Sequence, residues 1–304
     1  MRLGRTYPVR PAAIHTEGMA ALVVLLDSQE QKIPMNMLSI SKTLAAATVA
    51  LGVMAAGNAV AQEQTVRVGT VSGPDAEVWQ VVQKVAKKNG LNVKVVEFND
   101  YVQPNAALDA GDLDANSFQH QPYLDSQIKQ RGYKMVSVGF TYISPLGIYS
   151  KNLKSPKDLP QGAKVAVPND PSNENRALLL LAAQGAIKLK PGVGTNGVNA
   201  TPLDIAENPK KLKIVELDAA QLARALPDVA AAVINTNYAL AAGLQPTGNA
   251  IALEDIHSPY ANIIVVRTQD KDKPWVKKLV AAYQSEEVRQ FMKSQFKGAM
   301  VPSF

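Results

Sequence analysis

The sequence predicts an α/β protein built around mainly parallel sheets. After residue 62, short β-rich runs alternate with amphipathic helical runs, and this alternation starts again near residue 163 after the break "SPKDLPQG". The 304 residues, of which 46% are hydrophobic and 19% charged, are enough for two domains of ordinary size. We therefore expect two successive open-sheet units in one chain.

The first unit is expected to alternate three strands with three helices. Strands are predicted at 65–71, 91–98 and 114–119, and helices at 72–90, 103–111 and 123–132. Pro74 lies near the start of the first helix. Gly90, Gly111 and Gly132 follow the three helix ends, where glycine accepts the left-handed backbone of a helix stop.

The second unit follows a long β-rich stretch at 134–150. It is expected to contain strands at 163–170, 212–217, 230–236 and 258–267, an apolar helix near 176–185 and a last helix over 275–296. The long strands near 134–150 and 230–240 are predicted to cross between the units. Ligands of open α/β sheets bind beyond the carboxyl ends of the strands, so the loops there are candidate sites.

Composition argues against several classes of function. The net charge of +6 is spread along the chain, and its tight basic pairs lie near acids or on solvated helix faces, so nucleic-acid binding is not expected. Cysteine is absent, which excludes disulfides, thiolate nucleophiles and cysteine-ligated zinc.

The N-terminal 61 residues are predicted to be a targeting segment rather than a folded domain. An apolar run at 44–57 is followed by Ala59, Val60 and Ala61, the small-x-small pattern of signal peptidase sites. The run is shorter than the roughly 20 residues of a membrane span. We expect a signal peptide at 35–61, cleavage after Ala61 and export to the periplasm, with residues 1–34 a non-native extension from a misassigned start codon.

The stretch "DLDANSFQHQPYLD", residues 112–125, concentrates carboxylates and aromatics around His120. A metal site is not expected, because His257 is the only other histidine after residue 61 and no H-x-x-x-H pattern exists. A general base would need a nucleophile beside it, and no G-x-S-x-G pattern is present. Two interpretations stay open: His120 packs at a strand end, or it forms a pocket wall beside Phe118.

Arg176 is predicted to lie within two turns of a helix start, since Asp170 and Pro171 are typical of a cap and a first helical residue. A cation there opposes the helix dipole by roughly 0.3 to 1 kcal/mol. It could bind a ligand carboxylate through its planar fork, together with free amide N–H groups of the helix start. Alternatively, it is a surface arginine paired with Glu174 or a neighbouring acid.

Two asparagines accompany predicted strands. Asn235 in "INTNYA" and Asn262 in "SPYANI" each lie just after or inside a strand, and Tyr101 follows an earlier one. An amide has both donors and an acceptor, which suits the two ends of a zwitterion. Asparagine at a strand edge is also a common turn former, so the residues alone leave both roles open.

Four segments together resemble a known family. They are "FNDYVQPNAALDAGDLDANSFQHQPYLDSQIKQRGYK", "VAVPNDPSN", "IAENPKKLKIVELDAAQLARALPDVAAAVINTNYA" and "SPYANIIVVR". They resemble the methionine-binding MetQ/NlpA family of ABC-transporter substrate-binding proteins, from about residue 65 to about 295. The resemblance implies a two-lobed periplasmic-binding-protein fold of type 2, whose lobes close on a ligand in the cleft by hinge motion. It implies a first lobe of 63–141 plus 238–304 and a second lobe of 142–237.

The resemblance also implies roles for individual residues. Arg176 would bind the ligand carboxylate, and Asn235 and Asn262 would hold the ammonium and carboxylate, with Asn173 nearby. The side-chain pocket would be lined by three further residues: Tyr101, Phe118 and His120. The expected protein binds free D- or L-methionine, serves the membrane permease of an ABC importer, is a monomer, needs no cofactor or metal, and catalyses nothing.

Two departures from the family pattern carry expectations of their own. Many members are lipoproteins anchored through a cysteine, which this sequence lacks, so we expect a non-lipidated periplasmic protein. The "NEN" before Arg176 and the stretch "GFTYISPLGIY" also differ from the family, which leaves another amino acid or a short methionine peptide as alternative ligands. Rival functions are a periplasmic lyase-like enzyme using His120 with Asp114 or Glu174, and an adhesion or signalling module.

Overall fold

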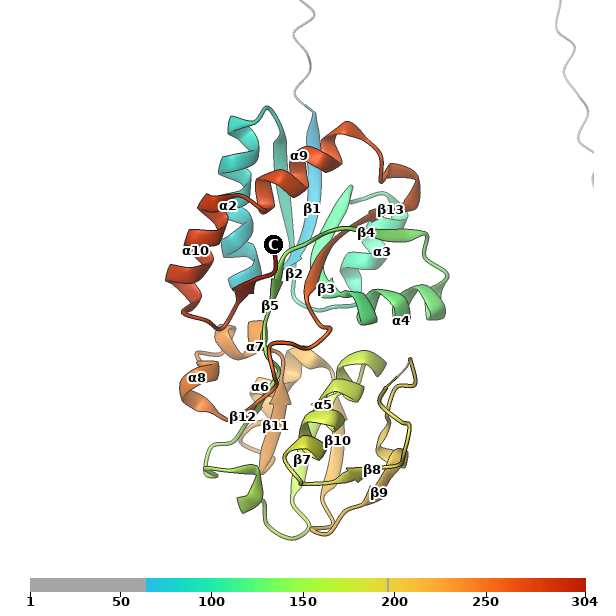
Figure 1. The fold of residues 1–304 in the computed structure, drawn as a ribbon, viewed down its shortest axis with the longest axis vertical. Helices are drawn as coiled ribbons and strands as arrows, with labels where there is room; N and C mark the ends of the chain where they lie inside the picture. The colour runs from blue at the N-terminus through green and yellow to red at the C-terminus, as the bar shows by residue number, and fades with distance from the viewer. Residues whose placement is uncertain (1–63, 196) are drawn as a thin grey trace, which may run out of the picture. The chain divides into compact units, whose positions relative to one another are not determined.

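The computed structural model describes residues 64–304 apart from residue 196, and in this part of the chain two five-stranded sheets are flanked by helices (Figure 1). We call each sheet with its helices a lobe. The predicted extension at 1–34 and signal peptide at 35–61, with its cleavage site after Ala61, lie outside the described residues.

The first sheet has the strand order β2-β1-β3-β13-β4. β1 runs parallel to β2 and β3, as the sequence predicts, whereas β13 runs antiparallel to both of its neighbours, so this sheet is mixed. The strands are β1 (Thr65–Val71), β2 (Asn92–Phe98), β3 (Ala115–His120), β4 (Met135–Phe140) and β13 (Asn262–Arg267). The helices are α2 (Pro74–Lys88), α3 (Gln103–Ala110), α4 (Gln121–Arg131), α9 (Pro274–Tyr283) and α10 (Glu286–Phe296).

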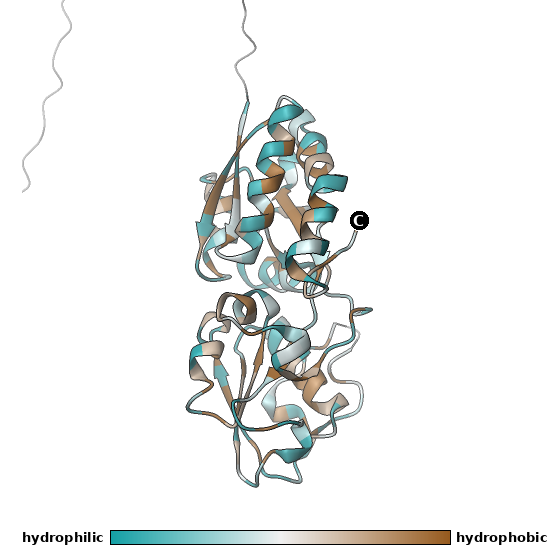
Figure 2. Cartoon of the chain, turned by 90° about the vertical axis from the view of Figure 1, so that its left-hand side faces the viewer, coloured by the Kyte–Doolittle hydropathy of each residue, from teal (hydrophilic) through white to brown (hydrophobic). Residues whose placement is uncertain are grey.

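Both faces of the first sheet are buried. Successive side chains of β13 alternate between two cores: Ile264 and Val266 pack with α2, α9 and α10, while Ile263 and Val265 pack with α3 and α4. This alternation follows from the two-residue period of a strand. Figure 2 shows the consequence in hydropathy, with hydrophobic strands between helices whose outward faces are mostly hydrophilic.

The second sheet has the order β10-β7-β11-β6-β12. β7 runs parallel to β10 and β11, while β6 runs antiparallel to β11 and β12. Here too β7 divides its side chains, with Val165 and Val167 in one core and Ala166 in another. The elements are β6 (Gly147–Tyr149), β7 (Lys164–Pro168), β10 (Lys213–Leu217), β11 (Ala231–Ile234), β12 (Ala250–Leu253), α5 (Pro171–Ala183), α6 (Leu222–Ala225), α7 (Thr236–Ala241) and α8 (Pro246–Asn249).

Several short elements complete the described chain. β8 and β9 form a separate antiparallel pair, and β14 pairs antiparallel with β5. They are β5 (Tyr142–Ile143), β8 (Lys188–Leu189), β9 (Ile205–Glu207), β14 (Val301–Pro302) and the single-turn 3-10 helices η2 (Pro156–Asp158), η3 (Pro202–Asp204), η4 (Ala219–Gln221) and η5 (Thr268–Asp270).

The chain passes between the lobes at two connections. The first runs from β4 through β5 to β6, where the sequence predicts a crossover at 134–150. The second was expected near 230–240, but β11 lies there inside the second sheet, and β12 joins that sheet as well. We therefore propose that the return connection is the segment 254–261 and that the second lobe reaches Leu253 rather than 237.

The helix predicted over 275–296 is two helices. α9 ends at Tyr283, and α10 begins at Glu286 after Ser285, whose hydroxyl oxygen accepts a hydrogen bond from the Val288 N–H. Serine at this position and two glutamates in the first turn are typical of a new helix start. The continuous apolar periodicity hid this break, because both helices bury their apolar faces in the same core.

Candidate functional site

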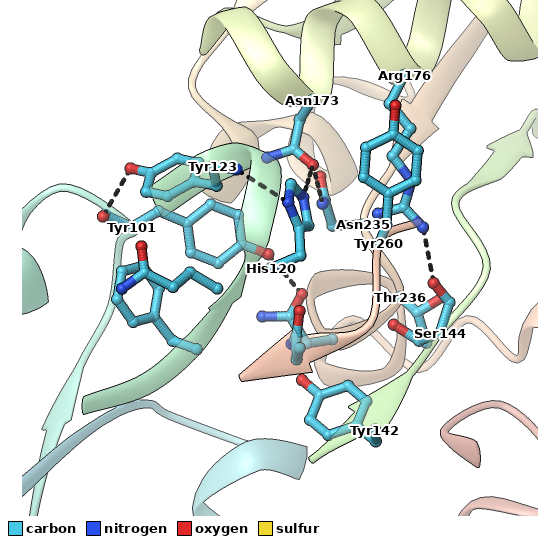
Figure 3. A pocket seen from close by; sticks show the side chains of 14 residues that line it. Tyr101, His120, Tyr123, Tyr142, Ser144, Asn173, Arg176, Asn235, Thr236 and Tyr260 are labelled. Atoms are coloured by element: carbon cyan, nitrogen blue, oxygen red, sulfur yellow. Dashed lines mark hydrogen bonds between the residues drawn. The ribbon is translucent and has the colours of Figure 1, made fainter. Parts of the chain in front are cut away.

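A pocket between the two lobes brings together all seven residues that the sequence analysis singled out (Figure 3). The empty space inside it, counted together with the open solvent at its mouth, is about 410 Å³. The residues that line it are Tyr101, Phe118, Gln119, His120, Tyr123, Tyr142, Ser144, Asn173, Arg176, Asn235, Thr236, Asn237, Tyr260 and Asn262.

The first wall of the pocket rests on β3, a strand that is buried along its whole length although it contains polar residues. The side-chain amides of Asn105, Asn116 and Gln119 satisfy one another: Asn105 and Gln119 exchange two hydrogen bonds of 2.9 and 2.7 Å, and Asn116 donates to Asn105 over 2.9 Å. A buried amide network of this kind is stable because its donors and acceptors are paired. It fastens α3, and the loop that carries Tyr101, to the strand that carries Phe118 and His120.

His120 ends β3 and caps α4. Its Nδ1 lies 3.2 Å from the Tyr123 backbone N–H, which can only donate, so Nδ1 accepts and the ring proton is on Nε2. Nε2 lies 3.1 Å from the Asn173 Oδ1 of the second lobe and donates to it. Burial, and next the charge of Arg176, lower the pKa of His120 to about 3, so the ring is neutral.

Asn173 connects this histidine with the second lobe. Its Oδ1 also accepts from the Asn235 Nδ2 over 3.0 Å, while its own Nδ2 donates to the Asp170 carboxylate over 2.9 Å. These bonds fix both amide orientations, and they leave the Asn235 Oδ1 buried without a hydrogen-bond partner among the described residues. Asn235 therefore offers the pocket an acceptor that suits a cationic donor.

Asp170 caps α5 as the sequence predicts, and its carboxylate accepts from the Asn173 backbone N–H over 2.9 Å. Burial raises the pKa of Asp170, whereas these hydrogen bonds act in the opposite direction. The expectation that amide N–H groups at the start of α5 are free to bind a ligand carboxylate is wrong for Asn173 and Glu174, because both of these N–H groups donate to Asp170.

Arg176 is buried, with 4% of its side chain exposed, and its partner is Glu254 rather than Glu174. Its Nε donates to Glu254 Oε1 over 2.7 Å and its Nη2 to Glu254 Oε2 and to the Ser144 carbonyl. The expectation that the planar fork binds a ligand carboxylate is wrong for that edge, because Glu254 already occupies it. Nη1 has no acceptor among the described residues and is the nitrogen left for an anion.

The opposite part of the pocket is aromatic. The ring centroids of Tyr101, Phe118 and Tyr123 lie 5.9 to 6.1 Å apart. The Tyr101 hydroxyl donates to Asn237 Oδ1 over 2.6 Å, and the Tyr123 hydroxyl donates to the Tyr101 carbonyl over 2.8 Å. Since these hydroxyl protons are engaged within the protein, the rings face the pocket as an apolar, polarizable surface.

Tyr142 lies where the first connection leaves β4. Its hydroxyl donates to the carboxyl group of Asp75, in the first turn of α2. Burial raises the pKa of Asp75 to about 7, while the bond from Tyr142 favours its charged form. This bond ties the first connection to the core of the first lobe.

The residues of the rival lyase do not converge. Asp114 forms an ion pair with Arg67 at 3.0 Å. It precedes His120 by six residues of extended chain, so the two residues lie about 20 Å apart. Glu174 does not line the pocket, and its pKa is raised to about 8 by burial and by the neighbouring Glu216. Both ring nitrogens of His120 are already hydrogen-bonded. Within the described residues, no group of three or more potential ligands could hold a metal ion.

The sequence analysis missed several lining residues that lie close to the ones it named. Tyr260 stands two residues before Asn262, Asn237 two after Asn235, and Tyr123 three after His120. Each missed residue therefore lies in a sequence segment from which the analysis had already named a neighbour. Tyr142 and Ser144 belong to the predicted crossover, and a crossover between lobes necessarily passes the cleft. Glu254 carries no local signal, because it follows an ordinary short strand.

Residues 66–304, which contain the whole pocket, match the sequence profile of the NlpA lipoprotein family. The chain belongs to the NlpA lipoprotein family. The D-methionine-binding lipoprotein MetQ of Salmonella typhimurium (strain LT2) is 53% identical over 266 residues, covering 86% of this chain and 97% of that protein. No helix in the described part of this NlpA-family chain is long and apolar enough to cross a membrane.

Solved structures of this family agree with the fold. A nutrient-binding protein from Burkholderia cenocepacia bound to methionine is 79% identical, with a TM-score of 0.78 over 79% of this chain and 100% of that one. A periplasmic substrate-binding protein of an ABC transporter from Coxiella burnetii is 52% identical, with a TM-score of 0.75 over 78% of this chain and 100% of that one. The predicted family and two-lobed fold are confirmed.

The neutral His120 predicts a pH dependence of stability. Its pKa is about 3 in the folded protein against 6.5 when unperturbed, so between these values the unfolded chain binds the extra proton. The contribution of His120 to the free energy of unfolding should therefore fall as the pH drops below 6.5, by up to about 1.4 kcal/mol per pH unit. Asp75 and Glu174, whose pKa values are raised to about 7 and about 8, contribute with the opposite sign, so the test is the difference between two proteins. In urea unfolding from pH 7.5 to 4.5, the wild-type protein should lose more stability, or gain less, than His120→Asn. A His257→Gln control, at an exposed site, should keep the wild-type slope; equal slopes in wild type and His120→Asn would contradict the prediction.

Proposed function

We propose that this protein is a periplasmic substrate-binding protein that delivers D- or L-methionine to the permease of an ABC importer. One observation carries the proposal: Arg176 Nη1 and Asn235 Oδ1, a donor and an acceptor without a partner among residues 64–195 and 197–304, belong to residues that line the same pocket as an aromatic wall. A zwitterion with an apolar side chain complements this arrangement. The methionine-binding relatives and the methionine-bound structure from Burkholderia cenocepacia support it.

The polar end of the pocket accounts for the backbone of an amino acid. We assign the ligand carboxylate to Arg176 Nη1 and the Asn262 amide, and the ligand ammonium to Asn235 Oδ1. Asn262 opens β13 and is paired in register with His120 on β3, so it stands at the mouth of the first lobe. A charged group hydrogen-bonded in a buried site contributes roughly 1.5 to 3 kcal/mol.

The aromatic end accounts for the side chain. A thioether is polarizable and gains about 0.3 to 1.5 kcal/mol against an aromatic ring. Tyr101, Phe118 and Tyr123 offer three such rings, and no hydroxyl proton of the two tyrosines is free to favour a polar ligand atom. Selectivity against apolar side chains of similar size should be modest, at about 1 to 3 kcal/mol.

Binding is coupled to closure of the lobes. The hydrogen bond from His120 to Asn173 joins β3 of the first lobe to α5 of the second, and Tyr101 to Asn237 makes a second bridge. Hinge closure around a ligand of this kind changes no covalent bond, and the protein is a carrier rather than an enzyme. It meets the permease as a monomer and needs no cofactor.

We also propose that the mature protein starts at Gln62 and is not lipidated, unlike relatives named as lipoproteins, because the chain has no cysteine. Mass spectrometry of the exported protein should give a single unmodified chain that begins at Gln62. A lipid-bearing mass, or a first residue before 58, would overturn this proposal.

The amide of Asn262 should be required for affinity. In Asn262→Ala a ligand charge loses a buried partner, so methionine should bind about tenfold to a hundredfold more weakly by calorimetry, and Arg176→Ala should be worse. Asn152→Ala, in an exposed turn, is the matched control and should bind like wild type. Unchanged affinity in Asn262→Ala would count against the site.

A thermal-shift panel on ligand-stripped protein should identify the ligand. Among the twenty amino acids methionine should raise the melting temperature most, since a ligand of the folded state stabilises it by RT ln(1 + [L]/Kd). Methionine sulfoxide should bind at least about tenfold more weakly than methionine, because its polar oxygen would lose water against the aromatic wall. A larger shift with another amino acid, or equal binding of the sulfoxide, would show that the pocket is built for a different side chain.

A further inference from the structure

The side chain of Arg176 contacts both connections between the lobes. It extends from α5 of the second lobe, and its Nη2 donates to the Ser144 carbonyl, in the first connection, over 2.8 Å. Glu254 opens the second connection directly after β12, and Tyr260 closes it just before β13. The guanidinium carbon lies 4.5 Å from the Tyr260 ring centroid. The charge that would bind the ligand is thus held where the lobes are joined.

Glu254 is itself held firmly. Its Oε2 accepts from the Leu146 backbone N–H over 3.2 Å, and its own backbone N–H donates to the Leu146 carbonyl over 2.9 Å. Only 13% of its side chain is exposed. The carboxylate therefore cannot turn away from Arg176 without breaking contacts with the first connection, and the two-point pairing fixes the guanidinium plane.

This pairing also sets the charge of the site. Arg176 is the charged member of the pocket lining, since His120 is neutral. The Asp170 carboxylate does not line the pocket and is bonded to Ser172 and Asn173 at the start of α5. Glu254 lies behind Arg176 and balances its charge, so the ion pair as a whole presents no net charge to the ligand.

We propose that Glu254 is a positioning residue that determines specificity. It occupies the Nε edge of Arg176, so that Nη1 is the nitrogen that faces the ligand. By balancing the arginine charge, it also makes the pocket select ligands of zero net charge over anions. The inference rests on the proposed function, since it concerns the same pocket. With Glu254 in place, a zwitterion leaves the buried charges balanced, whereas an anion without an ammonium adds an uncompensated charge. Without that carboxylate, the arginine would favour the anion.

Two ligands that differ only in the ammonium test this inference. Methionine and 4-(methylsulfanyl)butanoate share the carboxylate and the thioether. The ratio of their dissociation constants includes the ammonium's hydrogen bond, so the change in this ratio from wild type to a Glu254 variant isolates the charge preference. Calorimetry should show that Glu254→Gln lowers the ratio Kd(butanoate)/Kd(methionine) at least tenfold relative to wild type. Glu254→Asp, which keeps the charge, should restore the wild-type ratio even if both ligands bind more weakly.

Controls separate this effect from a general loss of structure. Glu207→Gln removes an exposed ion-pair carboxylate of the same lobe and should leave the ratio unchanged. An unchanged ratio in folded Glu254→Gln would overturn the inference while leaving methionine binding intact. Failure of wild type to bind methionine would instead overturn the proposed function and this inference with it.

A crystal structure of wild type with methionine decides the question even if Glu254→Gln does not fold. The inference expects Glu254 to remain on the Nε edge of Arg176, with the ligand carboxylate at Nη1. A ligand carboxylate that replaces Glu254 on the Nε edge would overturn it.

Discussion

The side-chain oxygen of Asn173 accepts one hydrogen bond from each lobe, and the rest of the site depends on this shared acceptor. His120 donates to it from β3, and Asn235 donates from the end of β11. Asp170 prevents the Asn173 amide from flipping, because its carboxylate takes the amide nitrogen while it caps α5. The Asp170 cap therefore fixes the oxygen to which both His120 and Asn235 donate, and so it sets the direction of the Asn235 carbonyl in the pocket.

In the proposed function, the polar and apolar groups that contact the ligand belong to different parts of the chain. The acceptor Asn235 and the cation Arg176 belong to the second lobe, whereas the aromatic wall belongs to the first lobe. Asn235 directly follows strand β11, while Arg176 and Tyr123 stand in the first two turns of the helices that follow β7 and β3. The buried amides of Asn105, Asn116 and Gln119 show how a polar strand remains stable in the middle of the first sheet, because their hydrogen bonds are made within the protein.

Local signals in the sequence predicted the start of α5, the left-handed helix ends at Gly111 and Gly132, and most strands, since each depends on neighbouring residues. All seven named residues line the pocket, but Asn173 was named from the family resemblance alone, and the residue pattern left the roles of the other six open. The second connection and the partner of Arg176 were not predictable from pattern, because β12 and Glu254 are placed by pairing with β6 and Leu146, more than a hundred residues earlier. The break between α9 and α10 was visible in Ser285 but was hidden by continuous hydrophobicity.

β14 pairs Val301 and Pro302 with Ile143 and Tyr142, and the Ser303 N–H donates to the Thr141 carbonyl over 3.0 Å. Strand β5, in the first connection, therefore has its partner in a segment that lies far along the sequence. Since synthesis proceeds from the N-terminus, this pairing cannot form before residues 301–303 have been made. The first connection is thus completed by a long-range contact rather than by its neighbours in the sequence.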